Sequence, residues 1–339
     1  MNYVNNVHFT CCQQASCICS SVLAKAVPRY FHQQSEALIT PLLIAITHQH
    51  SKVRVEAVRA LADVIQFGNN KSVEDVVPHL AQRLFDQAPV VRKAVIQLSG
   101  EWLLDLPDRY SFFHRLIPIL LTGFSDEVDE IKNLAMQYWL EVGQKYAKEN
   151  ENDLKDKMDF PSKDPSHYPH GILRPNLGCR TLMQRNLFKI LPALANDITD
   201  WILETRLKSV QLLYWLFINA EDNVTQHLVL IFNALHKAMN DDDKEIVKMA
   251  TDDAELISYF VPIDVWTPLL IDNIRSSHGS FSSLAITAAL IKGCEPKKLE
   301  GKYLKEIMES LTDDEVCFTL DVCLSVFLNQ YYIHFMLLL

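Results

Sequence analysis

Residues 72–107, SVEDVVPHLAQRLFDQAPVVRKAVIQLSGEWLLDLP, decide the fold of this chain. In each half the apolar residues recur at intervals of three and four, which is the spacing of an amphipathic helix. Asp86, Gln87 and Ala88 separate the halves, Pro89 suits the first turn of the second helix, and Pro107 ends it. The predicted apolar positions are Val73, Val76, Val77, Leu80, Ala81, Leu84 and Phe85, then Val91, Ala94, Val95, Leu98, Trp102 and Leu106. The stretch therefore predicts a helical hairpin that needs neighbours of the same kind to cover its apolar face.

Other parts of the chain repeat the spacing of this hairpin. Pro78 is followed by Asp86 after eight residues and by Arg92 after fourteen. The same two offsets recur at Pro118, Asp126 and Lys132, and again at Pro192, Asp200 and Arg206. Looser copies are Pro41 with Arg54, then Ala234 with Asp242 and Lys248, and a unit around Pro268 that keeps only the proline. Helix pairs that recur about every 40 residues form α-solenoids, so the prediction is an all-α superhelix of antiparallel helix pairs.

The order of these residues resembles one solenoid family, the HEAT repeat. A proline in the first helix, an aspartate in the turn, and an aliphatic residue followed by arginine at the start of the second helix are its pattern. In that family the aspartate and the arginine form a ladder between adjacent repeats. The resemblance assigns ladder positions to Arg54, Asp86, Arg92, Asp126, Lys132, Asp200 and Arg206. It assigns no residue to partner binding.

The repeat pattern divides the chain into four parts. Residues 1–36 are predicted to be a partial N-terminal repeat, and residues 37–147 three HEAT repeats. Residues 148–179 are a charged, proline-rich inserted loop, and residues 180–339 hold three to four further repeats, the last one degenerate and uncapped. In the partial repeat, the second helix of a pair whose first helix is missing is expected to contain Val22, Leu23, Ala26, Val27 and Tyr30.

Composition and charge argue against one class of function and indicate a cellular compartment. The chain has 339 residues, 49% of them hydrophobic, and only nine glycines, which suits an all-helical globular protein. A net charge of −10 argues against a general nucleic-acid binder, because a phosphate backbone requires a basic face. Eight scattered cysteines without a cleaved signal peptide indicate reduced thiols in an intracellular compartment. The N-terminal cluster, Cys11, Cys12, Cys17 and Cys19, lacks zinc-site spacing and is expected to be small thiols buried in a helix.

No constellation of catalytic, metal-binding or cofactor-binding residues is recognisable. His167, Tyr168 and His170 lie in the inserted loop without a convergent nucleophile or carboxylate, so we expect no enzyme site there. The acidic run at 240–243 lacks the alternating ligands of a calcium loop and is interpreted as a solvated turn. Residues 316–339 are long enough to span a bilayer, but polar interruptions and the lack of a basic flank favour an uncapped solenoid helix.

Several segments resemble a particular HEAT-repeat family, the dynein axonemal assembly factor 5 family. The resemblance covers roughly residues 30–295 and includes the atypical insert. The segments are HSKVRVEAVRALADVIQFGNNKSVEDV (50–76), HLAQRLFD (79–86), DRYSFFHRLIP (108–118), KENENDLKDKMDF (148–160), HYP (167–169), LGCR (177–180) and LFKILPALANDITDW (187–201). Members of that family are longer in both directions, so the chain is expected to be a fragment or a variant product.

The resemblance implies a cytoplasmic, non-enzymatic scaffold for the pre-assembly of axonemal dynein arms. Its implied partners are dynein intermediate and heavy chains, other dynein assembly factors and co-chaperones, with no nucleic acid, membrane, cofactor or small-molecule substrate. The alternative is a karyopherin-like transport adaptor or another generic HEAT scaffold, since these share the architecture. A tubulin binder of the TOG class is disfavoured, because the turns HQHS, DQAP, SDEVDE and NDDDKE are neutral or acidic.

Overall fold

The computed structural model describes residues 2–68, 72–155, 165–313 and 316, with side chains from residue 10 onward. Within these ranges the regular secondary structure is helical, and no strand occurs. The chain divides into two compact units, Met1–Asp153 and Leu154–Leu339. The predicted fold class, an all-α stack of helix pairs, is confirmed.

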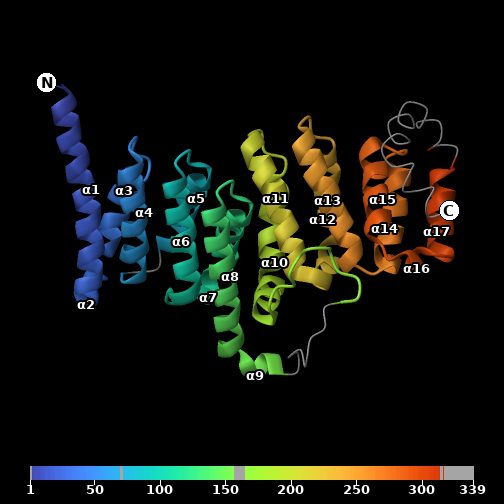
Figure 1. Cartoon of the computed structure of the whole chain (residues 1–339), viewed down its shortest axis with the longest axis horizontal. Coiled ribbons are helices and arrows are strands. Elements are labelled where there is room, and N and C mark those ends of the chain that lie inside the picture. The colour runs from blue at the N-terminus through green and yellow to red at the C-terminus, as the bar shows by residue number, and fades with distance from the viewer. Residues whose placement is uncertain (1, 69–71, 156–164, 314–315, 317–339) are drawn as a thin grey trace. The chain divides into compact units, whose positions relative to one another are not determined.

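The first unit is a series of helix pairs in two layers (Figure 1). In one layer α5 lies between α3 and α7 and contacts both, and in the other layer α6 lies between α4 and α8 and contacts both. The elements are α1 (Asn2–Ala26), α2 (Pro28–Phe31), α3 (Ser35–Ala45), α4 (Ser51–Gln66), α5 (Val73–Gln82), η2 (Arg83–Phe85), α6 (Pro89–Asp105), α7 (Arg109–Thr122), η3 (Gly123–Ser125), α8 (Asp129–Glu149) and α9 (Glu151–Leu154).

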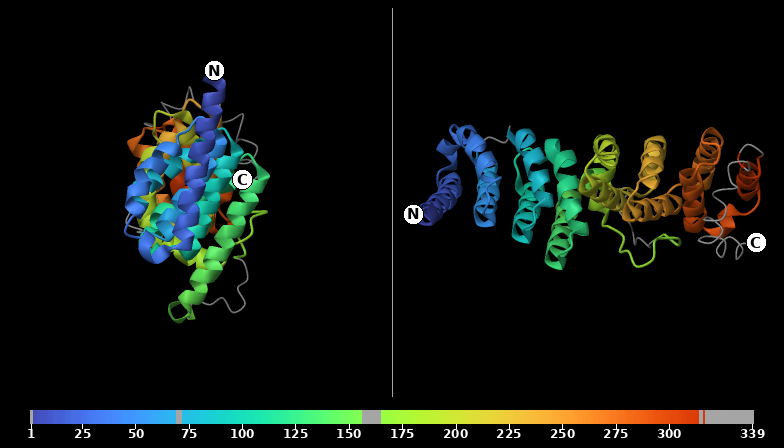
Figure 2. Two further views of the ribbon diagram at one scale, coloured as in Figure 1. Left: turned by 90° about the vertical axis from the view of Figure 1, so that its left-hand side faces the viewer. Right: turned by 90° about the horizontal axis from the view of Figure 1, so that it is seen from above.

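The second unit continues with helix pairs of the same kind (Figure 2). Helix α13 lies between α11 and α15 and packs on both, while α10 and α12 contact each other in the opposite layer. The elements are α10 (Leu177–Asp197), α11 (Leu203–Ala220), η5 (Glu221–His227), α12 (Leu228–Met239), α13 (Lys244–Phe260), α14 (Ile263–Ser276), α15 (Phe281–Gly293), α16 (Pro296–Leu299) and α17 (Lys302–Leu311).

The prolines that mark the repeats lie inside the first helix of their pairs. Pro41, Pro78, Pro192 and Pro268 lie inside α3, α5, α10 and α14, and all four are exposed. A proline within a helix removes one backbone hydrogen bond and frees the carbonyl of the residue four positions earlier. Because these four prolines are on the solvent side, water can bond the freed carbonyl, which reduces the cost of the missing hydrogen bond.

The hairpin at 72–107 buries the face that its spacing predicts. Val73, Val76 and Leu80 of α5 are fully buried, and so are Val91 and Val95 of α6. Trp102, also fully buried, donates its indole N–H to the carbonyl of Ala62 in α4 at 3.2 Å. The apolar faces therefore meet the preceding pair as well as each other. Phe85, at 36% exposed, is the member of the predicted set that faces solvent.

The N-terminal part of the chain differs from its prediction. Helix α1 packs against α4 through Cys17 and Ala24, and Lys25 forms a 2.8 Å ion pair with Asp63 of α4. The apolar residues expected in the second helix of the partial repeat are exposed: Val22, Leu23, Ala26, Val27 and Tyr30. The expectation of buried thiols is wrong for Cys11, Cys12 and Cys19, which are exposed, and right for Cys17. Apolar and small residues occur around most of this helix, so periodicity alone could not choose the covered side. The small side chains of Cys17 and Ala24 allow a close approach to α4.

The predicted insert is shorter than expected at its C-terminal side. Helix α10 begins at Leu177, three residues before the predicted restart, because the side chain of Asn176 accepts a hydrogen bond from the backbone N–H of Cys179 at 2.9 Å. Residues 156–164 of the predicted loop lie outside the described residues, and so does the C-terminal apolar stretch except for Val316. Among the described helices, none combines the length and the apolar character that crossing a bilayer requires.

Gly100 sets how closely α6 and α8 approach. A Cβ atom at this position would lie 2.3 Å from Cγ of Tyr138. Alanine is favoured over glycine within an exposed helix by about 1 kcal/mol. Here the clash outweighs that gain, so Gly100→Ala is expected to lower the free energy of unfolding by about 1–3 kcal/mol in urea titrations. The double variant with Tyr138→Ala should lose less than the two single losses added together. A Gly100→Ala chain at least as stable as the original would contradict this close contact.

Asp253 of α13 is a second stability determinant. Its side chain is fully buried, and neither carboxylate oxygen has a hydrogen-bond partner in the part of the chain that the structure describes. Burial, and then the charge of Asp252, raise the pKa of Asp253 well above its usual value. The folded state therefore keeps this proton to a higher pH than the unfolded state, and stability falls as pH rises above the unfolded pKa.

Asp253→Asn removes the titrating group and should raise the melting temperature at pH 7. Its advantage over the original chain should grow between pH 5 and pH 8 in thermal scans, because the original chain must bury a charge or hold a proton. The exposed Asp242→Asn is the matched control and should show no such growth. An advantage that stays constant with pH would show that Asp253 titrates normally.

Candidate functional site

The turns between the two helices of a pair carry the predicted ladder residues. In four of these turns an aspartate lies two residues before the N-cap of the second helix, and its carboxylate accepts a hydrogen bond from the N-cap backbone N–H. The pairs are Asp86 with Ala88 at 2.9 Å, Asp126 with Val128 at 2.9 Å, Asp200 with Ile202 at 2.7 Å and Asp241 with Asp243 at 2.9 Å. Each aspartate thus fixes the backbone of its own turn.

In the first unit Arg54 joins its own turn to the following one. Its Nε and Nη2 donate to the two carboxylate oxygens of Asp86, both at 2.7 Å. Its Nη1 donates to the carbonyls of His48 and Gln49 at 2.7 and 2.9 Å. The planar guanidinium can do this because it offers donors in two directions at once.

Arg92 repeats the arrangement one pair later. It bonds the carboxylate of Asp126 through Nε at 2.8 Å and Nη2 at 3.0 Å, and it bonds the carbonyl of Asp86 through Nη1 at 2.8 Å. The side chains of Arg92 and Asp126 are each only 7% exposed. The turns of the first unit are therefore linked from Arg54 through Asp86 and Arg92 to Asp126.

Lys132 occupies the arginine position of the next turn but does not act like Arg92. Its ammonium forms a 3.2 Å ion pair with Asp129 of its own helix, whose side chain is 88% exposed. A lysine offers a single charged tip and cannot bond a turn carbonyl and a carboxylate in two directions. The carboxylate of Asp200 accepts a hydrogen bond from the Ile202 backbone N–H, as described above. This is the bond by which Asp200 fixes its own turn.

In the second unit Arg206 forms the corresponding bridge. It donates to the carboxylate of Asp241 through Nε at 2.6 Å and Nη2 at 3.2 Å, and to the carbonyl of Asp200 through Nη1 at 3.0 Å. The sequence offsets matched Asp242 and Lys248 instead, and that match is wrong by one residue. In the other turns the aspartate lies two residues before the N-cap of the second helix and the cation four residues after it. Because the N-cap of α13 is Asp243, the same count identifies Asp241 as the aspartate and puts Val247 at the arginine position.

The ladder lowers the pKa of two of its carboxylates, those of Asp86 and Asp241. Burial alone would raise the pKa of Asp86, but the hydrogen bonds from Arg54 and the Ala88 backbone N–H, with the Arg54 charge, hold it below its usual value. Burial opposes a similar set for Asp241, where Arg206 and the Asp243 N–H lower the pKa. Such carboxylates stabilise the fold above their unfolded pKa, and this stabilisation is lost as pH falls through the folded pKa.

The described end of the insert, from residue 165, packs against the second unit. The ring of His167 stacks on Tyr259 with centroids 4.4 Å apart, and its Nε2 lies 2.6 Å from the carbonyl oxygen of Gly293. The guanidinium of Arg174 bonds both carboxylate oxygens of Glu221 at 2.7 and 2.8 Å. His167 thus attaches this segment to the ends of α13 and α15, which gives it a packing role.

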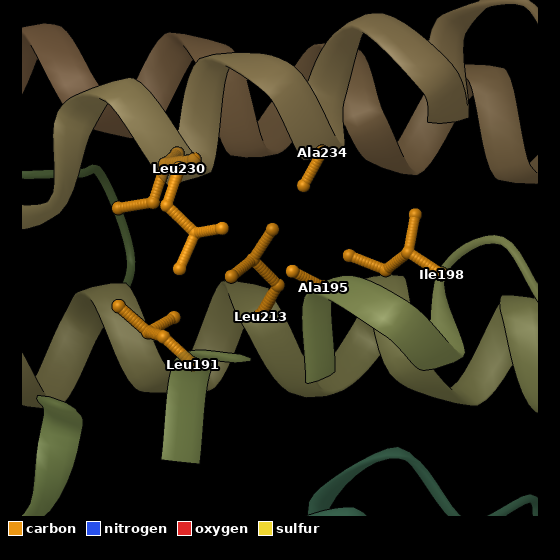
Figure 3. Close-up of a pocket in the computed structure, with 7 residues that line it drawn as sticks. Leu191, Ala195, Ile198, Leu213, Leu230 and Ala234 are labelled. Atoms are coloured by element: carbon orange, nitrogen blue, oxygen red, sulfur yellow. The ribbon is translucent and has the colours of Figure 1, made fainter. Parts of the chain in front are cut away.

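A small pocket lies between α10, α11 and α12 (Figure 3). Its cavity volume is about 10 Å³, and its lining is entirely apolar: Leu191, Ala195, Ile198, Leu213, Leu230, Ile231 and Ala234. Ligand pockets usually measure about 300–1,000 Å³ and carry a few polar groups. This pocket is a packing defect. Among the described residues, no group of three or more His, Cys, Asp or Glu is placed to hold a metal ion.

One exposed turn escaped the sequence analysis. Trp201 follows the ladder residue Asp200 and is 87% exposed, beside Ile202 at 40% and Leu203 at 45%. The turn sequences compared above did not include this one. The sequence does contain a signal for it, because the residue after the ladder aspartate is polar in the other turns and tryptophan in this one. The polar residues are Gln87, Glu127 and Asp242.

Arg92 and Lys132 form a matched pair for testing the ladder. Arg92→Ala leaves the buried Asp126 without its cation, so we expect the free energy of unfolding to fall by about 3–5 kcal/mol. Lys132→Ala removes only an exposed pair within one helix and should cost about 0–1 kcal/mol. Urea unfolding followed by circular dichroism measures both. Equal losses at the two positions would refute the distinction between a bridging arginine and a solvated lysine.

Two family models match most of the chain, and the short interval between them lies within the predicted insert. "Dynein axonemal assembly factor 5-like, TPR repeats" matches residues 4–157, and "Dynein axonemal assembly factor 5, HEAT-repeat domain" matches residues 166–330. The interval between the matches is next to the boundary of the two compact units, after Asp153.

Curated relatives carry the same family name. Dynein axonemal assembly factor 5 of Homo sapiens is 48% identical over 309 residues, which are 91% of this chain and 36% of the relative. The Xenopus laevis protein is 46% identical over 305 residues, 90% of this chain and 36% of the relative. The chain thus spans about a third of their length.

A designed armadillo repeat protein for modular peptide recognition is similar at a TM-score of 0.30 and 17% identity, covering 72% of this chain and 92% of that one. A score this low supports no argument. The family models and the relatives agree with each other over nearly all of the chain. The chain belongs to the dynein axonemal assembly factor 5 family.

Proposed function

We propose that this chain is part of a non-enzymatic scaffold for the cytoplasmic pre-assembly of axonemal dynein arms. The observation that carries the proposal is the 48% identity to human dynein axonemal assembly factor 5 over 91% of the chain. Dynein intermediate and heavy chains are the proposed clients. Other dynein assembly factors and co-chaperones are the proposed accessory partners.

The helix pairs supply a surface suited to large clients. The arginine bridges fix the turns of successive pairs, so the edge that carries these turns is pre-organised within each unit. A pre-organised surface binds with a smaller entropic cost than a flexible one. A row of fixed turns therefore favours a scaffold that holds a client by many moderate contacts.

The charge of this edge indicates which client surfaces it would attract. Several exposed carboxylates in the turns are available to a partner, among them Asp242 and Glu245 beside the N-terminus of α13. The whole chain carries a net charge of −10. Basic patches on unfinished dynein subunits would be steered to such an edge, and the attraction would weaken with salt.

Co-precipitation from the cytosol of ciliating cells tests this function. Dynein intermediate and heavy chains and co-chaperones should be enriched with the tagged chain before arms appear in axonemes. Asp242→Lys with Glu245→Lys places cations on the turn edge and should reduce the recovery of dynein chains several-fold. Glu74→Lys with Asp75→Lys makes the same charge change in the first turn of α5, away from that edge, and is the matched control.

Two results would contradict the proposal. One is equal loss of dynein chains from both charge variants, which would show that net charge rather than the turn edge governs recovery. The other is nucleotide-dependent recovery of a small nuclear GTPase in place of dynein chains. That result would favour the karyopherin-like alternative.

A further inference from the structure

The turn between α10 and α11 exposes three large apolar side chains together. Trp201 is 87% exposed, and Ile202 and Leu203 are 40% and 45% exposed. Single exposed aliphatic residues are common on protein surfaces, whereas tryptophan is largely buried on average. Tryptophan is also among the residues most enriched at the energetic centres of protein interfaces. The turn therefore has the composition of an interface anchor.

The backbone of this turn is held in place from both sides of Trp201. Arg206 Nη1 donates to the carbonyls of Asp200 and Trp201 at 3.0 and 3.3 Å, and the Asp200 carboxylate accepts from the Ile202 N–H at 2.7 Å. Arg206 is itself fixed by Asp241 of the next turn. The indole is therefore presented by a rigid backbone, which reduces the entropy that binding would cost.

The ladder does not require tryptophan at this position. The residues that follow Asp86, Asp126 and Asp241 are Gln87, Glu127 and Asp242, all polar and all exposed. The same turn geometry therefore forms with a polar residue in place of Trp201. Trp201, Ile202 and Leu203 therefore form an exposed apolar cluster that the turn geometry does not require, and such clusters mark interaction sites.

The surroundings of Trp201 are strongly acidic. Residues 197–206 and 240–245 together contain seven carboxylates and two cations, and one of the cations, Arg206, is bound to Asp241. Asp197 and Glu204 are exposed close to the turn in sequence, and Asp242 is exposed on the turn that Arg206 bridges. This field repels nucleic acid and anionic lipid and attracts basic protein segments.

We propose that the Trp201 turn docks a basic, apolar segment of a partner protein, such as an amphipathic helix with lysine or arginine flanking a leucine stripe. The stripe covers the indole, Ile202 and Leu203, and the cations face the surrounding carboxylates. The identity of the client rests on the proposed function, whereas the chemistry of the docking site is tested independently of it.

Tryptophan fluorescence can report on this turn directly. Trp102, Trp139 and Trp266 are buried and Trp215 is half-buried, so Trp201 is the tryptophan most open to aqueous quenchers. Because its surroundings are acidic, caesium should quench it more strongly than iodide. The probe is a synthetic 18-residue peptide of leucine and lysine with helical spacing. Its binding should protect Trp201 from acrylamide and should weaken with salt.

Variants and a charge-reversed probe make the test specific. Trp201→Gln copies the residue at position 87 and should weaken peptide binding, measured with a labelled peptide, by about tenfold or more at an unchanged melting temperature. Phe188→Gln removes another exposed aromatic residue, 55% exposed in α10, and should keep the original affinity. A peptide with glutamate in place of lysine should bind at least tenfold more weakly.

Three results would overturn the docking site. They are unchanged affinity in Trp201→Gln, equal loss in Phe188→Gln, and a lowered melting temperature in Trp201→Gln, which would assign the indole to stability. Failure of dynein chains to co-precipitate with the original chain would refute the proposed function and leave the peptide result standing. The two failures are therefore distinguishable.

Discussion

The stacking of these helix pairs depends on an arginine that bonds the turn of its own pair and the aspartate of the next. Arg92 does both at 3.0 Å or less, with Asp86 and Asp126 as partners, while the side chains of Arg92 and Asp126 are almost fully buried. A buried charge is stable only when it is paired and hydrogen-bonded on all sides. The bridge therefore permits one register between successive pairs and disfavours others.

Each pair depends on its neighbours for the burial of its apolar faces. Trp102 of α6 reaches back to α4, and Gly100 of the same helix admits the ring of Tyr138 from α8. Such an arrangement has no single centre, and a solenoid gains stability from each interface between neighbouring pairs. The arginine bridges fix the turns between the helices. The outward side chains of these turns do not take part in the bridges, so they can differ without loss of stability.

In the ladder turns, the residue that fixes the backbone and a residue that is open to solvent are next to each other in sequence. The ladder aspartate faces inward, and the residue after it faces solvent. Where that residue is Gln87, Glu127 or Asp242 it is polar, and where it is Trp201 it forms an apolar anchor among carboxylates. The turn geometry therefore accepts different side chains at this position while the aspartate keeps its bond to the N-cap N–H. This is why the fold alone does not name a client.

The sequence by itself determined the helix pairs, their period and most of their buried faces, because apolar spacing and the proline and aspartate positions are local properties of the chain. The resemblance to the HEAT repeat, and not the spacing alone, assigned Arg54, Asp86, Arg92 and Asp126 to a ladder, and hydrogen bonds join Arg54 to Asp86 and Arg92 to Asp126. Only the tertiary structure decided which side of α1 is covered, that Arg206 pairs with Asp241, that Lys132 turns to its own helix, and that Trp201 is exposed. These outcomes depend on how close neighbouring helices approach and on the turn length measured from the helix cap, and neither is encoded in a single helix.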